Sequence, residues 1–95
     1  MSEVSNRREQ IRDQPSYWIE KINGELYESM MNFMDSHNMN QKDLAEHLGI
    51  SAGRMSQIIN EGDINFSLEK IIRIALKLGK IPSFNFKDKE EVEIG

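Results

Sequence analysis

Residues 41–60 read QKDLAEHLGISAGRMSQIIN, and this stretch carries the clearest structural pattern in the sequence. Its apolar residues recur at spacings of three and four, the period of one buried helical face, and Gly49 interrupts the pattern halfway. Because glycine adopts the left-handed conformation that ends a helix at little cost, the stretch predicts two short helices joined by a tight turn. The positions that meet the demands of two steeply crossing helices are Gln41, Leu44, Ala45, Leu48, Gly49, Ile50, Met55 and Ile58. Any helical hairpin needs apolar positions and a glycine, but it does not need this full set at this spacing.

Capping residues predict where three helices begin. Asn40 precedes the first of them, and Asp43 adds a carboxylate at the positive end of that helix dipole. Ser51 and Ser67 are suited to cap the next two helices. Glycines Gly62 and Gly79 follow these helices as stop signals. The residues of the last helix that are spaced for burial are Leu68, Ile71, Ile72, Ala75 and Leu78.

A longer amphipathic helix is predicted ahead of this region, beginning near Pro15 and ending at 37–39. Its apolar stripe consists of Trp18, Ile22, Leu26, Met30 and Phe33 or Met34. We expect Trp18 to belong to the core, with a dimer or partner interface near Tyr17 and Trp18 as the alternative. Since Asn23 and Gly24 disfavour helix interiors, the helix is expected to bend there or to split in two.

The two ends of the chain differ from this helical region. Residues 1–14 are polar and without periodicity, and we interpret them as a flexible arm. Residues 15–81 form the predicted domain, and 82–95 a short strand and charged tail. Within that tail, Phe84 and Phe86 alternate with polar residues, which predicts a lone β-strand. Such a strand would have to pair with the same strand of a second subunit, unless the segment packs irregularly.

Composition limits the possible classes of protein. With 95 residues the chain can build one domain, and without cysteine it has neither disulfides nor thiolate metal ligands. No apolar stretch approaches membrane-spanning length, and no apolar run follows Arg7, Arg8 and Arg12 as a secretory signal requires. We therefore expect a cytoplasmic protein without membrane association.

An enzyme is not expected, because the sequence offers no cluster of nucleophile, base and stabilising group. His37 and His47 lack the neighbouring cysteines or carboxylates of a zinc site, and no glycine-rich phosphate loop is present. The sequence thus predicts no catalytic residue, no metal and no cofactor.

Residues 41–60 resemble the helix-turn-helix of lambda-type phage repressors and of the xenobiotic-response-element (XRE) class of bacterial regulators. The resemblance extends from Ser16 to Gly79, because the helix before the motif and the Ser67-Leu68-Glu69-Lys70-Ile71 start of the last helix also match. It implies an all-α, compact four- or five-helix lambda-repressor-like domain. The long N-terminal helix and the short C-terminal β-strand predicted from the residues themselves would complete this chain. The resemblance also implies a homodimer that binds double-stranded DNA and regulates transcription, usually as a repressor.

This resemblance assigns the recognition helix to residues 52–60, which would enter the major groove. Gln57 could pair with an adenine edge, while Arg54 could reach guanine or a phosphate. At Ala52 and Gly53 the sequence departs from better-known repressors, so we expect more readout of DNA shape. The full set of predicted DNA-binding residues is Gln41, Lys42, Ser51, Ala52, Gly53, Arg54, Ser56, Gln57 and Asn60.

Two features leave alternatives open. The net charge of −4 opposes DNA binding, although residues 16–40 carry four acidic residues against one lysine and so hold much of the acidity away from the recognition helix. Lys70, Arg73 and Lys77 share one helical face that could flank the phosphate backbone or simply be solvated. A second function class is an antitoxin or protein-binding adaptor that neutralises a toxin or other partner and represses its own operon.

Overall fold

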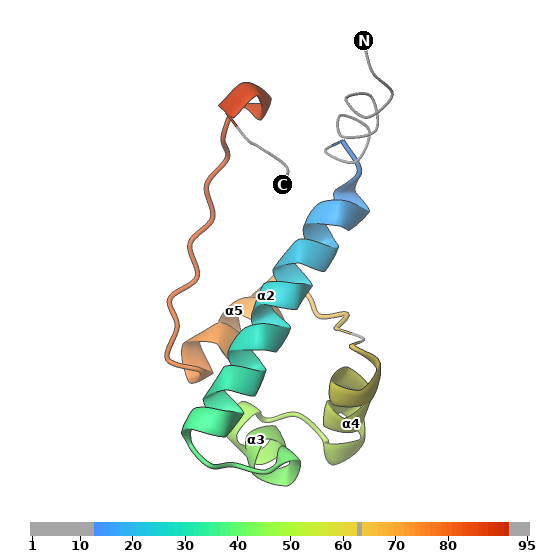
Figure 1. The fold of residues 1–95 in the computed structure, drawn as a ribbon, viewed down its shortest axis with the longest axis vertical. Coiled ribbons are helices and arrows are strands. Elements are labelled where there is room, and N and C mark those ends of the chain that lie inside the picture. The colour runs from blue at the N-terminus through green and yellow to red at the C-terminus, as the bar shows by residue number, and fades with distance from the viewer. Residues whose placement is uncertain (1–12, 63, 92–95) are drawn as a thin grey trace.

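The computed structural model describes residues 13–62 and 64–91. Four α-helices are present there: α2 (Pro15–Ser36), α3 (Gln41–Leu48), α4 (Ala52–Glu61) and α5 (Leu68–Lys77). A short 3-10 turn, η1 (Lys89–Glu91), follows. In Figure 1, α5 crosses behind α2, α3 lies near the C-terminal end of α2, and α4 lies beside α3. The all-helical prediction is confirmed for this part of the chain.

Helix α2 is continuous over 22 residues, so it does not split in two at Asn23 and Gly24, one of the two outcomes expected there. The helix tolerates Asn23 because its side-chain amide donates a hydrogen bond to the Ile64 carbonyl oxygen at 2.8 Å. This bond ties the helix to the α4–α5 loop and offsets the low helix propensity of asparagine.

The predicted caps of the short helices are confirmed. Asn40 and Asp43 form a reciprocal capping box at the start of α3, and Ser51 and Ser67 accept backbone N–H groups at the starts of α4 and α5. Gly49 ends α3 with a φ of 69°, a left-handed value that is sterically unfavourable for residues with a Cβ atom. These local signals fix the length of each short helix and the direction in which the chain leaves it.

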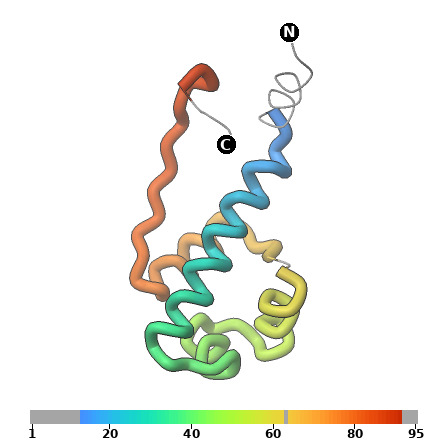
Figure 2. The backbone as a smooth tube through the Cα atoms, in the orientation of Figure 1, coloured from blue at the N-terminus to red at the C-terminus, as the bar shows by residue number. Residues whose placement is uncertain are grey.

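The core lies where α2, α3, α4 and α5 meet. Its fully buried large side chains are Met30, Leu44, Met55, Ile58 and Ile74. Figure 2 shows α3 and α4 beside the C-terminal half of α2, away from its start. Only Leu26 and Met30 of α2 are buried, so its first turns extend beyond the core.

Two side chains that the sequence predicts to be buried, Trp18 and Leu68, lie outside the core. Trp18 is half-buried and lies outside the core cluster, because the first turns of α2 extend past the other helices. Its ring instead meets Tyr17 edge-on at 4.9 Å and lies beneath the Lys21 ammonium at 5.4 Å. Leu68, in the first turn of α5, is 59% exposed, whereas Ile74 takes the buried position on that helix.

The predicted C-terminal strand is absent from the described residues, which contain no strand at all. Residues 80–88 are not helical, and the backbone bonds that bracket them are Lys80 N–H to Ala75 O and Glu91 N–H to Asp88 O. A strand forms only with a partner strand, and the described part of this helical chain offers none. The segment returns to the start of α2, where Lys89 and Asp13 form an ion pair.

Candidate nucleic-acid interface

The outer face of α4 is defined by its buried face. Met55 and Ile58 are fully buried, so the side of the helix opposite to them faces solvent. Gly53, Gln57 and Asn60 are exposed on that side. Their spacing of three and four keeps them on one continuous stripe of the helix surface.

Polar side chains on this stripe are paired with one another. The Arg54 guanidinium donates to the Gln57 side-chain oxygen at 3.3 Å, and the Asn60 amide donates to the Ser56 hydroxyl at 3.0 Å. Exposed bonds of this kind exchange readily with water, so the same groups can turn to an external partner. The helix thus presents hydrogen-bond donors and acceptors on its exposed side.

The first turn of α4 is open. Ser51, Ala52 and Gly53 are exposed, and a Cβ atom added at Gly53 would have no neighbouring atom within 4 Å. A macromolecule can therefore approach the backbone of this turn closely. The positive end of the α4 dipole lies at the same place, which favours an anionic partner.

The start of α3 offers a second anion-compatible position. Gln41 is half-buried and Lys42 is exposed, and they are the first two residues of the helix. The capping box uses the N–H groups of Asn40 and Asp43. Since the first N–H groups of a helix have no intrahelical acceptor, those of Gln41 and Lys42 can donate to a phosphate.

Two residues of α2 that the sequence analysis did not assign to the site hold α4 in position. The Tyr27 hydroxyl donates to the Ile59 carbonyl oxygen at 3.2 Å, in the last turn of α4, where carbonyls lack intrahelical donors. Asn23 holds the loop that follows through Ile64. The available signal was their spacing of four, which places two polar side chains on one side of α2.

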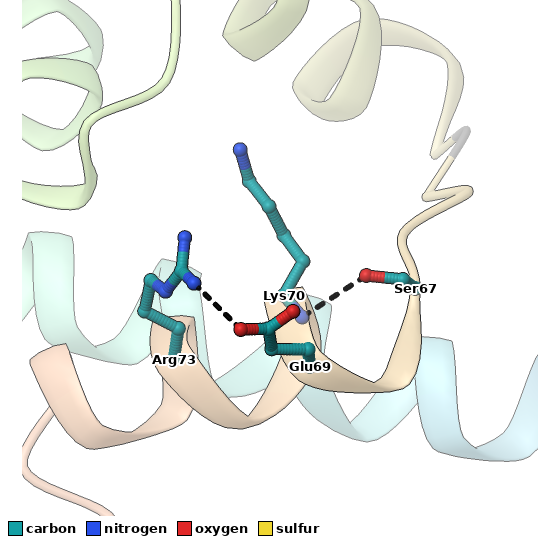
Figure 3. Close-up of polar contacts among 4 residues, drawn as sticks. All are labelled: Ser67, Glu69, Lys70 and Arg73. Carbon is teal, nitrogen blue, oxygen red and sulfur yellow. Dashed lines mark hydrogen bonds and ion pairs between the residues drawn. The ribbon is translucent and has the colours of Figure 1, made fainter.

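Phe66 was also missed. The Arg54 Cζ atom lies 5.1 Å from its ring centroid, and the Lys70 Nζ atom lies 5.5 Å from it. Figure 3 shows Lys70 extending away from the axis of α5, while Arg73 turns to Glu69, 3.0 Å away. Of the three cations predicted to flank the site, Lys70 is therefore the one that shares an aromatic ring with Arg54.

The two histidines have structural roles. The His47 ring is stacked 5.0 Å from that of Phe33, and its Nε2 is 2.7 Å from the Lys77 carbonyl oxygen, which joins α3 to α5. The His37 ring is stacked 3.9 Å from the same phenylalanine. Across residues 13–62 and 64–91, no cluster of three His, Cys, Asp or Glu side chains could hold a metal ion.

No helix within the described ranges is both long and apolar enough to cross a bilayer.

Comparison with known proteins places this site in a family. The chain matches a helix-turn-helix family model over residues 30–83, more than half of its length, and this span contains α3, α4 and α5. Searches of curated proteins and of solved structures returned no match. The matched region includes both helices of the motif and every residue predicted to contact DNA. The chain therefore belongs to the XRE-type helix-turn-helix family of DNA-binding regulators.

Proposed function

We propose that this protein is a sequence-specific double-stranded DNA-binding transcriptional repressor, acting as a dimer with α4 in the major groove. The observation that carries the proposal is the outer face of α4, which is polar and open and has Arg54 as the only charged residue between Ala52 and Asn60. An acidic side chain there would repel the phosphates on both sides of the groove, and none is present before Glu61.

Three residues of α4 would contact base edges in this proposal. Gln57 is exposed at the centre of the outer face, where its amide can pair with the N6 and N7 atoms of adenine. Ser56 can accept or donate, and Arg54 can reach guanine or a phosphate. Ala52 can touch a thymine methyl group, and Gly53 permits close backbone approach, which favours readout of groove shape.

The remaining predicted residues would position the helix on the phosphate backbone. Gln41 and Lys42 offer N–H groups and a side-chain charge at the start of α3. Ser51 and Asn60 lie at opposite ends of α4, next to where the groove walls would run. Such contacts fix the register of the protein on DNA without reading its sequence.

The C-terminal segment supports the dimer. Phe86 is fully exposed, Ile81 is 88% exposed and Phe84 is about half exposed. Apolar side chains on an extended backbone would be covered by pairing with the same segment of a second copy, in a two-fold arrangement. Two copies would then place two α4 helices on a palindromic operator.

The proposal is tested by selecting bound duplexes from a random DNA pool at near-physiological salt with the full chain. We expect enrichment of a roughly palindromic motif with half-sites about one helical turn apart. A pool that remains random after repeated rounds would contradict sequence-specific regulation.

The same exposed apolar residues favour a second candidate, an antitoxin or adaptor that binds a partner protein. This candidate predicts a small toxin-like reading frame beside the gene, whose product co-purifies with the protein. Loss of the complex on Phe86→Ser, with DNA binding retained, would support this candidate. A complex that survives this change would show that the C-terminal segment is not the surface that binds the partner.

A further inference from the structure

Phe66 lies in the loop between α4 and α5, within cation–π distance of a cation from each helix. Arg54 belongs to α4 and Lys70 to α5, and both distances to the ring centroid are below 6 Å. The ring is half-buried and packs against the core, which limits its movement. One half-buried aromatic ring therefore lies within reach of two cations that come from different helices.

The two cations occupy equivalent places. Each is the third residue after a serine cap, and its backbone N–H donates to that serine, Arg54 to Ser51 at 3.1 Å and Lys70 to Ser67 at 3.2 Å. The corresponding residue of α3 is the acidic Asp43, which completes a capping box. A cation is repelled by the positive end of a helix dipole. At this position, α4 and α5 therefore carry a residue that stabilises the helix less than the aspartate of α3 does.

Glu69, the acidic residue next to Lys70 in α5, does not pair with Lys70. Glu69 forms its ion pair with Arg73, one turn further along the helix, as Figure 3 shows. Arg54 in turn donates to the Gln57 side-chain oxygen at 3.3 Å. The Phe66 ring is thus connected, through Arg54, to the residue that we assign to base readout.

We propose that Phe66 is a positioning residue that holds Arg54 and Lys70 together as a phosphate clamp at the edge of the recognition helix. The clamp grips the DNA backbone beside the major groove, and through Arg54 it orients Gln57. This inference rests on the proposed DNA-binding function and adds to it a residue that does not itself touch DNA.

The test compares Phe66→Leu with Phe66→Tyr in the full chain, using the enriched duplex over a range of salt concentrations. Leucine keeps an apolar side chain but removes the ring, and we expect it to weaken binding about four- to 25-fold, because it removes two cation–π interactions that each contribute a factor of about two to five. The slope of log K against log salt should become shallower by up to about 1 for each phosphate that the protein no longer neutralises. Tyrosine keeps the ring and should bind as the wild type does.

Two controls separate positioning from folding. Phe33→Leu removes another half-buried core aromatic, one that stacks on histidines, and should leave the salt slope unchanged. In an Arg54→Ala, Lys70→Ala background, Phe66→Leu should have no further effect on affinity, because the cations through which it acts are gone. Thermal unfolding of each variant verifies the fold. If Phe66→Leu does not fold, Phe66→Met takes its place.

A readout without DNA also tests the clamp. The ring current of Phe66 should shift the side-chain proton resonances of Arg54 and Lys70 in the wild type and in Phe66→Tyr, but not in Phe66→Leu. Wild-type affinity and slope in Phe66→Leu, or an undiminished effect in the background lacking both cations, would overturn the clamp alone. A wild-type protein that binds no duplex would overturn both the clamp and the proposed function.

Discussion

Gly53 lies in the first turn of α4, where no neighbouring atom within 4 Å requires the absence of a side chain. A glycine inside a helix lowers stability relative to alanine because its unfolded state has more conformational freedom. Gly24 has equally open surroundings in α2. Since packing explains neither glycine, the place of Gly53 on the proposed DNA-facing surface gives a functional reason for it that Gly24 lacks.

Replacing Gly53 by alanine should therefore stabilise the fold and weaken DNA binding. We expect the free energy of unfolding to rise by about 0.5–1 kcal/mol, while the added methyl group hinders close approach to the groove. Denaturant unfolding and duplex affinity measure the two effects. Gly24→Ala is the matched control and should raise stability without changing affinity; reduced affinity in both variants would contradict this role.

Gln57→Ala should remove base discrimination while leaving the fold intact, because the side chain is exposed. Loss of a bidentate pair costs about 1–3 kcal/mol of discrimination at one base-pair position. Competition between the enriched duplex and its single-base variants measures this effect. Asn32→Ala removes an exposed amide from α2 instead and should leave base preference as it is; unchanged preference in Gln57→Ala would refute the assignment.

At the scale of the helices, α4 is held by bonds that come from α2. Tyr27 reaches the last turn of α4 and Asn23 reaches the loop after it. Met55 and Ile58 fix the rotation of α4 about its own axis by their burial. These contacts together decide which face of α4 is exposed to solvent.

Tyr27→Phe should destabilise the protein by about 0.5–1.5 kcal/mol, because the Ile59 carbonyl loses a donor at the end of α4. Chemical denaturation measures the change. Tyr17→Phe serves as the control, since the Tyr17 hydroxyl makes no hydrogen bond to the described residues. Equal stability of Tyr27→Phe and the wild type would show that this bond contributes nothing to seating α4.

Signals that act within a few residues were predictable from the sequence. Asn40, Ser51 and Gly49 cap their helices as their chemistry requires, and each acts on backbone within one turn. The continuity of α2 could not be predicted, because Asn23 is compensated by Ile64, 41 residues away. The pairing of Phe66 with two cations likewise depends on how α4 and α5 are brought together.

For the whole molecule, part of the acidity lies on α2, away from the proposed DNA contacts, although Asp43 and Glu69 lie in the first turns of α3 and α5. The proposed interface draws on the starts of α3, α4 and α5, whereas Glu20, Glu25 and Glu28 all lie on α2. The predicted C-terminal strand failed because strand formation depends on a partner, and a monomer of helices supplies none in its described residues. Local alternation of polar and aromatic residues is therefore not enough to predict a strand in that segment.

A double change, Phe84→Ser with Phe86→Ser, should shift the protein from dimer to monomer without unfolding it, because both side chains lie outside the core. Sedimentation over a range of concentrations measures the state. Leu76→Ser removes an exposed apolar residue from α5 and should leave the dimer intact. Wild-type protein that sediments only as a monomer at high concentration, with and without DNA, would count against dimerisation.

We propose that the outer face of α4 contacts double-stranded DNA, and every other part of the interface depends on this contact. It is tested most directly by following the backbone amide resonances of the full chain while the enriched duplex is added. The largest shifts should occur at residues 51–60, with further shifts at Gln41, Lys42 and Lys70. Shifts confined to other surfaces, such as the start of α2 or the segment that contains Phe84 and Phe86, would contradict it.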